Sequence, residues 1–222
     1  MVNTVVNRMI EIGKSILDFI IPPRSNYEIV KKLDEKTIYS LPKSQKVTDI
    51  EWITPLFQYK DTRVKAIIWE LKYKENVSPL ETIGKIIFEE IISVISDISL
   101  FNNNAEFLLI PIPITTESRV QRGYNQSELI AKSIIDCDTQ RLLIYAPQWL
   151  GKVKETPKQS HSNSKEERVK NLSDCFDADE RVFGKYIFLI DDVVTTGTTL
   201  TEARKILIGK GAKDVIGFTI AH

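Results

Sequence analysis

The 222-residue sequence contains only two cysteines and two histidines, and neither type is clustered. Cys137 and Cys175 lie far apart and form no C-x-x-C pair, which argues against a disulfide framework or a zinc ribbon. His161 and His222 have no neighbouring ligand residues, so we predict no protein-bound metal. The cysteine usage is typical of a reducing compartment, and we expect a cytoplasmic location.

The sequence also lacks an excess of charge and a long apolar run. Its 30 Lys and Arg residues balance 30 Asp and Glu residues, which argues against a strongly basic nucleic-acid binder but leaves a local patch open. No stretch is long and apolar enough to span a bilayer. Residues 1–23 place apolar side chains at helical spacing between charges, which predicts an amphipathic helix that packs on the protein. A membrane-surface or partner helix is the alternative.

Two regions are predicted from composition and periodicity. Residues 1–50 comprise the N-terminal helix and a polar, irregular segment, in which only residues 37–41 indicate a strand. Residues 51–222 form the main domain. The hydrophobic fraction of 42% is enough for a substantial core.

Within residues 51–222, short apolar runs alternate with helical patterns. Strand followed by helix followed by strand favours an α/β fold with a parallel sheet flanked by helices. Asn125 is predicted to cap a helix, with Glu128 reaching back as in a capping box. The polar stretch 150–176 has no periodicity and is either a lid that closes over a substrate or a solvated loop. We predict strands at 53–59, 107–113, 186–190 and 214–221, and helices at 62–73, 80–95, 125–135 and 199–211.

The sequence IFLIDDVVTTGTTL at residues 187–200 is the most informative segment. A strand over 187–190 delivers the following loop to the carboxyl edge of the sheet, where ligands of open α/β folds bind. Gly197 permits a turn that a side chain would block. The free N–H groups of the next helix and the hydroxyl groups of Thr195–Thr199 then form a site for phosphate.

Asp191 and Asp192 stand beside this phosphate site. Two carboxylates suit sugar hydroxyls, or a Mg²⁺ ion that the hydroxyls share. A phosphate site next to a diol site describes a ribose 5-phosphate. The alternative is that the two acids only end a strand and cap a helix. The sequence has neither the G-x-x-x-x-G-K pattern of a nucleotide P-loop nor a G-x-G-x-x-G pattern.

This segment resembles the 5-phosphoribosyl-1-pyrophosphate (PRPP) motif of type I phosphoribosyltransferases. The resemblance implies that Asp191 and Asp192 bind the ribose hydroxyls. It also implies that the loop surrounds the 5-phosphate and that Mg²⁺ is carried mainly by PRPP. The loop residues are Val194, Thr195, Thr196, Gly197, Thr198 and Thr199.

From about Phe57 to the C terminus the chain resembles the competence protein F (ComF) family. A strand with Pro111 and Pro113 leads to the R-G-Y-N-Q segment at 122–126. Further matching positions follow at Thr156, Gln159, Arg168, Asn171 and Phe176. Chains of this family commonly carry a four-cysteine zinc module after a proline pair. Here no cysteine follows Pro22 and Pro23 in that region, so zinc is not expected.

Three basic residues are candidates for the pyrophosphate group. Arg119 and Arg122 lie in the segment after the second strand, and a guanidinium holds phosphate oxygens through paired hydrogen bonds. Lys72 could reach the same anion. The alternative is that all three are solvated surface charges. We predict Asp191, Asp192 and Arg122 as catalytic residues, with Arg119 and Lys72 among those that bind substrate.

The acceptor is not specified by the sequence. Salvage phosphoribosyltransferases place an acid where Thr195 stands, so no general base for a purine is visible. One hypothesis is a PRPP-dependent transferase that uses Mg²⁺ and an unidentified acceptor. The alternative is a non-catalytic DNA-uptake component that binds single-stranded DNA and competence proteins, with the basic stretch 152–170 as the contact. A nucleotide-sensing regulator on the same fold is less favoured.

Overall fold

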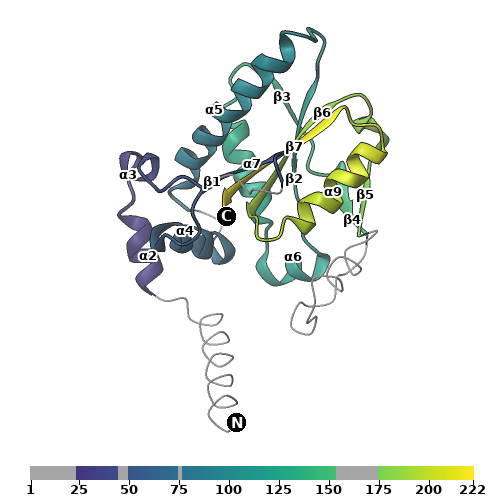
Figure 1. Cartoon of the computed structure of the whole chain (residues 1–222). Helices are drawn as coiled ribbons and strands as arrows, with labels where there is room; N and C mark the ends of the chain where they lie inside the picture. Colours follow the sequence, from purple (N-terminus) through teal and green to yellow (C-terminus); the bar gives the residue numbers. More distant parts are fainter. Residues whose placement is uncertain (1–23, 45–49, 75–76, 154–174) are drawn as a thin grey trace.

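The structure is a computed structural model that describes residues 24–44, 50–74, 77–153 and 175–222. The predicted helix within 1–23, and most of the polar stretch predicted to be a lid or loop, lie outside the described residues. The central feature is a parallel five-stranded sheet in the order β1-β7-β6-β2-β3 (Figure 1), which confirms the predicted α/β fold. Its strands are β1 (Ile53–Phe57), β2 (Phe107–Pro111), β3 (Leu143–Tyr145), β6 (Tyr186–Val193) and β7 (Asp214–Ala221).

β2 and residues 187–190 of β6 are apolar and buried because helices cover both faces of the sheet. Neighbouring residues of a strand point to opposite faces. Accordingly, Phe188 and Ile190 of β6 belong to one buried cluster, and Ile187 and Leu189 belong to the other. Figure 1 shows α4, α5 and α7 on one side of the sheet and α9 with a small second sheet on the other.

The main helices begin near their predicted residues. Their bounds are Thr62–Tyr73 for α4, Leu80–Ser99 for α5, Gln126–Ile135 for α7 and Thr198–Gly209 for α9. Helix α5 is longer than predicted and packs closely on α7 at Gly84. A Cβ atom there would lie 2.5 Å from Ser133 Oγ, so glycine is what allows the two helices to approach.

The segment predicted as irregular, with a strand at 37–41, forms two short helices, α2 (Arg24–Lys31) and α3 (Glu35–Tyr39). The predicted strand is therefore wrong. The Asp34 carboxylate accepts a hydrogen bond from the Thr37 N–H group at 2.8 Å and caps α3. Val30, Ile38 and Leu41 are buried in the same cluster as α4, α5 and α7, so this segment packs on the main domain.

Several short elements were not predicted. They are β3, the helix α6 (Thr116–Arg122), the 3₁₀-helix η1 (Glu180–Val182), and the strands β4 (Leu150–Lys152) and β5 (Phe176–Ala178). The last two pair antiparallel as a two-stranded sheet that packs with α9, one at each end of the polar stretch. Among the described residues, no helix combines the length and apolar character needed to cross a bilayer.

The register brings the strand ends together at one edge. Val193 of β6 and Phe57 of β1 both pair with Ala221 of β7, and Pro111 of β2 pairs with Ile190. The segments that follow β1, β2 and β6 therefore leave from the same edge of the sheet. This edge carries the loop after β6 and the start of α7.

Candidate functional site

The two acids lie at the end of β6. The sequence suggested that they follow the strand, but β6 continues through Asp191 and Asp192 to Val193. Its pairing with β7 persists to the last residue, because Asp191 is in register with Thr219 and Val193 with Ala221. The strand therefore fixes the backbone of both acids within the sheet.

The loop after β6 leaves backbone N–H groups free at the start of α9. The Val194 N–H group donates to Ala221 O at 3.0 Å, and the Thr201 N–H group donates to Gly197 O at 2.9 Å. Among the residues that the structure describes, none accepts a hydrogen bond from the N–H groups of Thr198, Thr199 or Leu200. A helix N-terminus carries partial positive charge, so these groups are suited to an anion.

The loop encloses a hollow of about 40 Å³, lined by Asp191 and residues 193–200. One water needs about 10–15 Å³ of such space, so the hollow holds a few water-sized groups, such as phosphoryl oxygens. The hydroxyl groups of Thr196 and Thr198 lie 2.8 Å apart at this loop. The structure thus brings together Asp191 and all the loop residues that the sequence predicted.

Gly197 gives the loop its shape. Its φ of 71° is in the left-handed region, which favours glycine, and it is the residue that precedes α9. A Cβ atom there would lie 2.3 Å from Cδ1 of Ile50 and 3.7 Å from Cδ1 of Ile53. The glycine is thus required both by the backbone conformation and by the side chains that pack behind the loop.

Asp191 is tied to the start of α7. Its Oδ1 atom accepts hydrogen bonds from Ser127 Oγ at 3.0 Å and from the Asp192 N–H group at 2.9 Å. Burial of the carboxyl group and the adjacent charge of Asp192 raise the pKa of Asp191 to about 7, although these hydrogen bonds act in the opposite direction. Asp191 can therefore exchange a proton near neutral pH.

Asp192 has a different environment. Its Oδ1 atom accepts a hydrogen bond from the Val193 N–H group at 2.8 Å, and its side chain does not line the hollow. The Asp192 side chain nevertheless interacts with the Asp191 carboxyl group, since, in addition to burial, both its charge and its side-chain contact act to raise the pKa of Asp191. Their positions suit two different groups of one ligand.

The segment between β2 and α7 carries the predicted arginines. The Asn125 side chain caps α7 by accepting from the Ser127 N–H group at 3.0 Å, as predicted. The predicted reach-back of Glu128 is wrong, because its carboxylate accepts from the Arg119 guanidinium at 2.9 and 3.1 Å. The Arg122 guanidinium donates to Gln126 Oε1 at 3.2 Å. Both arginines are thus held at the start of α7.

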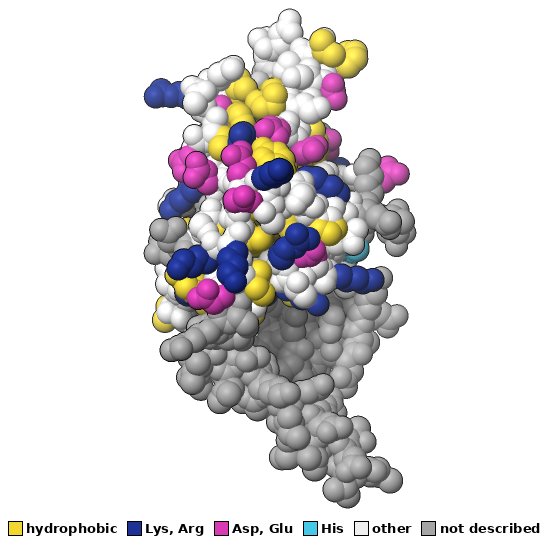
Figure 2. All heavy atoms as spheres, turned by 90° about the vertical axis from the view of Figure 1, so that its left-hand side faces the viewer, with side chains coloured by type: hydrophobic (Ala, Val, Ile, Leu, Met, Phe, Trp, Pro, Cys, Tyr) yellow, Lys and Arg dark blue, Asp and Glu magenta, His cyan; other side chains and the backbone are white. Residues whose placement is uncertain are grey.

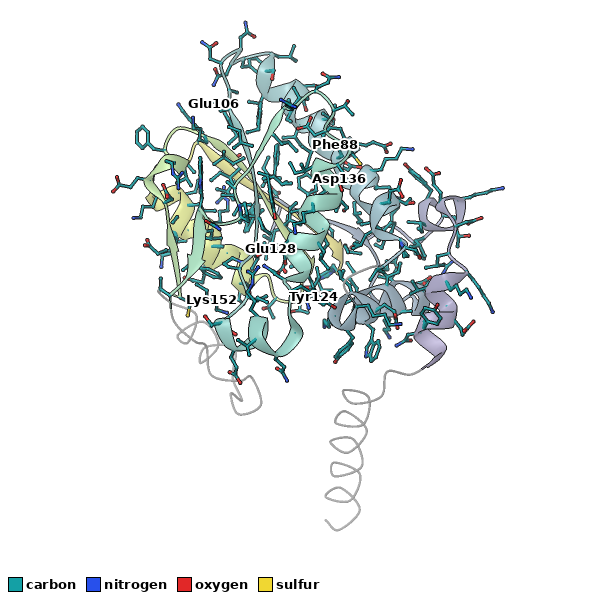
Figure 3. All side chains as sticks on the ribbon, turned by 180° about the vertical axis from the view of Figure 1, so that it is seen from behind. Phe88, Glu106, Tyr124, Glu128, Asp136 and Lys152 are labelled. Carbon is teal, nitrogen blue, oxygen red and sulfur yellow. The ribbon has the colours of Figure 1, made fainter. Side chains whose placement is uncertain are left out.

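The end of α4 lies next to this segment. The Tyr124 hydroxyl donates to Leu71 O at 3.2 Å, and Lys72 is half-buried in the last turn of α4. This contact brings the end of α4, which carries Lys72, next to the start of α7, but among the described residues Lys72 makes no hydrogen bond or ion pair with Asp191 or Asp192. Figure 3 shows Tyr124 and Lys152 at the same end of the molecule, with Glu128 on α7.

Sequence reasoning missed two residues at this site. Ser127 binds Asp191 directly, and no local pattern signals a contact between residues 64 apart. Lys152 of β4 was treated only as part of a basic stretch. It is half-buried, and burial lowers the pKa of its amine, while Cys175 and, to a smaller extent, the negative charge of Asp191 act to raise it. The amine of Lys152 on β4 is therefore close enough to Asp191 for their charges to interact.

The arrangement suits oxygen-rich, anionic ligands. Among residues 24–44, 50–74, 77–153 and 175–222, no group of three or more His, Cys, Asp and Glu side chains could hold a metal ion by itself. The parallel sheet with an acid pair and an amide-lined loop at its carboxyl edge defines an α/β protein consistent with a phosphoribosyltransferase-like arrangement.

The chain is similar to curated proteins over about half of its length. It is 38% identical over 117 residues to the competence protein ComFC of Bacillus subtilis (strain 168), which covers 51% of this chain and 44% of that protein. It is 29% identical over 110 residues to the DNA utilization protein YhgH of Salmonella typhi, covering 48% of this chain and 45% of that protein. The match to ComFC of Streptococcus pneumoniae is 28% over 118 residues, or 53% of this chain and 49% of that protein.

These similarities support assigning the chain to the ComF family, as the motifs from Phe57 onward predicted. The matches span about half the length of the curated relatives. No protein-family model matches the sequence.

Proposed function

We propose that the chain binds PRPP, or a related phosphoribosyl ligand, together with Mg²⁺ at the end of β6. The observation that carries the proposal is the row of N–H groups at Thr198–Leu200, beside Asp191, that have no hydrogen-bond acceptor within the described part of the chain. The loop would bind the 5-phosphate, and the two carboxylates would bind the ribose hydroxyls. This assignment explains why a phosphate site and two acids occur at one sheet edge.

The residues present fit a substrate-borne Mg²⁺ ion. Mg²⁺ is usually held by one or two carboxylates together with substrate phosphates and waters. Asp191 and Asp192 supply such oxygens. In the described part of the chain, no N–H or O–H group donates a hydrogen bond to Oδ2 of Asp191. When bound, Mg²⁺ neutralises negative charge on the pyrophosphate.

The reaction that this site supports is phosphoribosyl transfer. The bond between ribose C1 and the pyrophosphate oxygen would break, and pyrophosphate would leave with the bonding electrons. The acceptor would form the new bond to C1 with its own electron pair and release its proton to water. Arg122 and Arg119, which contact residues at the start of α7, would bind the departing anion. Arg119 would exchange its Glu128 partner for phosphate oxygens.

Isothermal titration with PRPP and Mg²⁺ tests this proposal. We expect the wild type to bind at millimolar ligand or below, and Asp192→Asn and Gly197→Val to abolish binding. Asp97→Asn is the matched control, because Asp97 is exposed on α5 away from the loop. Absence of heat with the wild type at millimolar PRPP would refute the proposal.

A second candidate function is suggested by the names of the relatives. The names ComFC and DNA utilization protein support a role in competence or DNA uptake, in which the chain binds single-stranded DNA and competence proteins. The basic stretch 152–170, which lies mostly outside the described residues, is the predicted DNA contact. Figure 2 shows Lys and Arg interspersed with Asp and Glu on the face that carries α2, α3 and α4, which does not favour that face for a polyanion.

Fluorescence anisotropy with labelled single-stranded DNA at several salt concentrations tests the second candidate. We expect log affinity to fall with log salt, and replacement of Lys158, Lys165 and Arg168 by glutamine to flatten that slope. Replacement of Lys85, which pairs with Glu35 on another part of the surface, is the control. A wild type that shows no affinity at low salt would eliminate direct DNA binding.

A further inference from the structure

A closed chain of hydrogen bonds links the strand ends to the start of α7. Asn125 Nδ2 donates to Ile112 O at 2.9 Å, and the Ile112 N–H group donates to Ile190 O at 2.9 Å. Asn125 Oδ1 accepts from the Ser127 N–H group, and Ser127 Oγ donates to Asp191 Oδ1. The series of hydrogen bonds thus begins at Ile190 and ends at Asp191, two neighbouring residues of β6.

The side chains in this chain are held away from water. Asn125 is 1% exposed and Ser127 is 3% exposed, so neither has solvent as an alternative partner. A buried hydroxyl that loses its acceptor is left with an unmet hydrogen bond, which keeps Ser127 directed at Asp191. Its backbone is fixed in turn, because Asn125 caps the helix at this residue.

The effect on Asp191 is directional. Its Oδ1 atom receives two hydrogen bonds, whereas no N–H or O–H group in the described part of the chain donates to Oδ2; the Asp192 side chain also contacts the Asp191 carboxyl group. The terminal torsion of an aspartate is broad, so the carboxylate would otherwise sample many orientations. With Oδ1 held in place, Oδ2 points in a fixed direction and is available to a ligand. A carboxyl group that is already oriented loses less conformational freedom when the ligand binds.

We propose that Ser127, held by Asn125, is a positioning residue that sets the orientation of the Asp191 carboxyl group for a ribose hydroxyl. The inference rests on the proposed phosphoribosyl site and goes beyond it, because Ser127 belongs to neither the acid pair nor the threonine loop. The ligand contact is made by Asp191, and Ser127 acts only through that residue.

The test compares two sugar phosphates that differ by one hydroxyl. Titrations with ribose 5-phosphate and 2-deoxyribose 5-phosphate, each with Mg²⁺, give the preference for the hydroxylated sugar. Ser127→Ala should weaken ribose 5-phosphate binding by about two- to tenfold, because the freed Asp191 side chain must then be ordered when the sugar binds. The deoxy sugar should be affected less, so the preference falls. Ser127→Thr keeps a hydroxyl and should restore part of it.

Ser133→Ala is the matched control. Ser133 lies on the same helix, and its hydroxyl donates to Ile130 O at 2.7 Å, away from the acids. It should leave the sugar preference unchanged, and circular dichroism with thermal melting shows whether each variant is folded. An unchanged preference in folded Ser127→Ala, with wild-type binding intact, would overturn the positioning role alone. Failure of the wild type to bind either sugar phosphate would overturn the proposed function as well.

Discussion

Replacing Gly197 by alanine should destabilise the protein by about 1.5–3.5 kcal/mol. A non-glycine residue with φ near 71° costs about 1–2 kcal/mol. The new Cβ would also lie 2.3 Å from Ile50 Cδ1, the end of a flexible, half-buried side chain, and turning that side chain off its rotamer costs about 0.5–1.5 kcal/mol. The two contributions are independent, because one arises within the backbone and the other from a neighbouring side chain.

Urea denaturation of a double-mutant cycle separates the two contributions. Ile50→Ala opens the space behind the loop, so in that background Gly197→Ala should cost only the backbone part, about 1–2 kcal/mol. Gly209→Ala is the control on the same helix, because no atom lies within 4 Å of the added Cβ. It should be neutral or stabilise by up to about 1 kcal/mol. Equal effects of Gly197→Ala and Gly209→Ala would refute the reasoning.

Three further outcomes are expected. Burial raises the pKa of Asp191 to about 7, so the folded protein retains a proton that the unfolded chain releases near pH 4. The free energy of unfolding should therefore fall as the pH rises from about 4 to 7. Asp191→Asn should remove this fall in urea denaturation across pH, and an unchanged profile would contradict the raised pKa. Arg119→Met should lose less than about 1 kcal/mol, since Arg119 is 57% exposed in its ion pair, yet weaken pyrophosphate binding by titration. Unaltered pyrophosphate affinity would remove Arg119 from the site. Phe188→Ala should cost about 3–5 kcal/mol by denaturation and Phe101→Ala almost nothing, because the first is fully buried and the second is 93% exposed; similar losses would contradict the burial.

The parts of the site that follow one another in the sequence were predictable. The apolar run 187–190 requires burial on both faces, and Gly197 among threonines requires a turn, so the strand and the loop follow from local chemistry. The strand at 37–41 was predicted wrongly because Thr, Ile and Tyr favour strands by composition. The cap by Asp34 and the burial of Ile38 decide for a helix instead.

The contacts between distant segments were not predictable. Glu128 stands three residues after Asn125, as in a capping box, and only the folded chain shows that Arg119 takes its carboxylate. Ser127 meets Asp191 across 64 residues for the same reason. Such contacts depend on how α7 docks against β6, which periodicity does not encode.

The order of the strands has a consequence for synthesis. β7 comes last in the described chain but lies between β1 and β6. Among the described residues, β7 is the one strand that pairs with β1, and the other side of β1 carries a single bridge between Lys43 and Phe57. A nascent chain therefore carries β1 with an open edge until residues 214–221 have emerged. Removal of those few residues would leave a gap in the middle of the sheet and expose two strand edges to other chains.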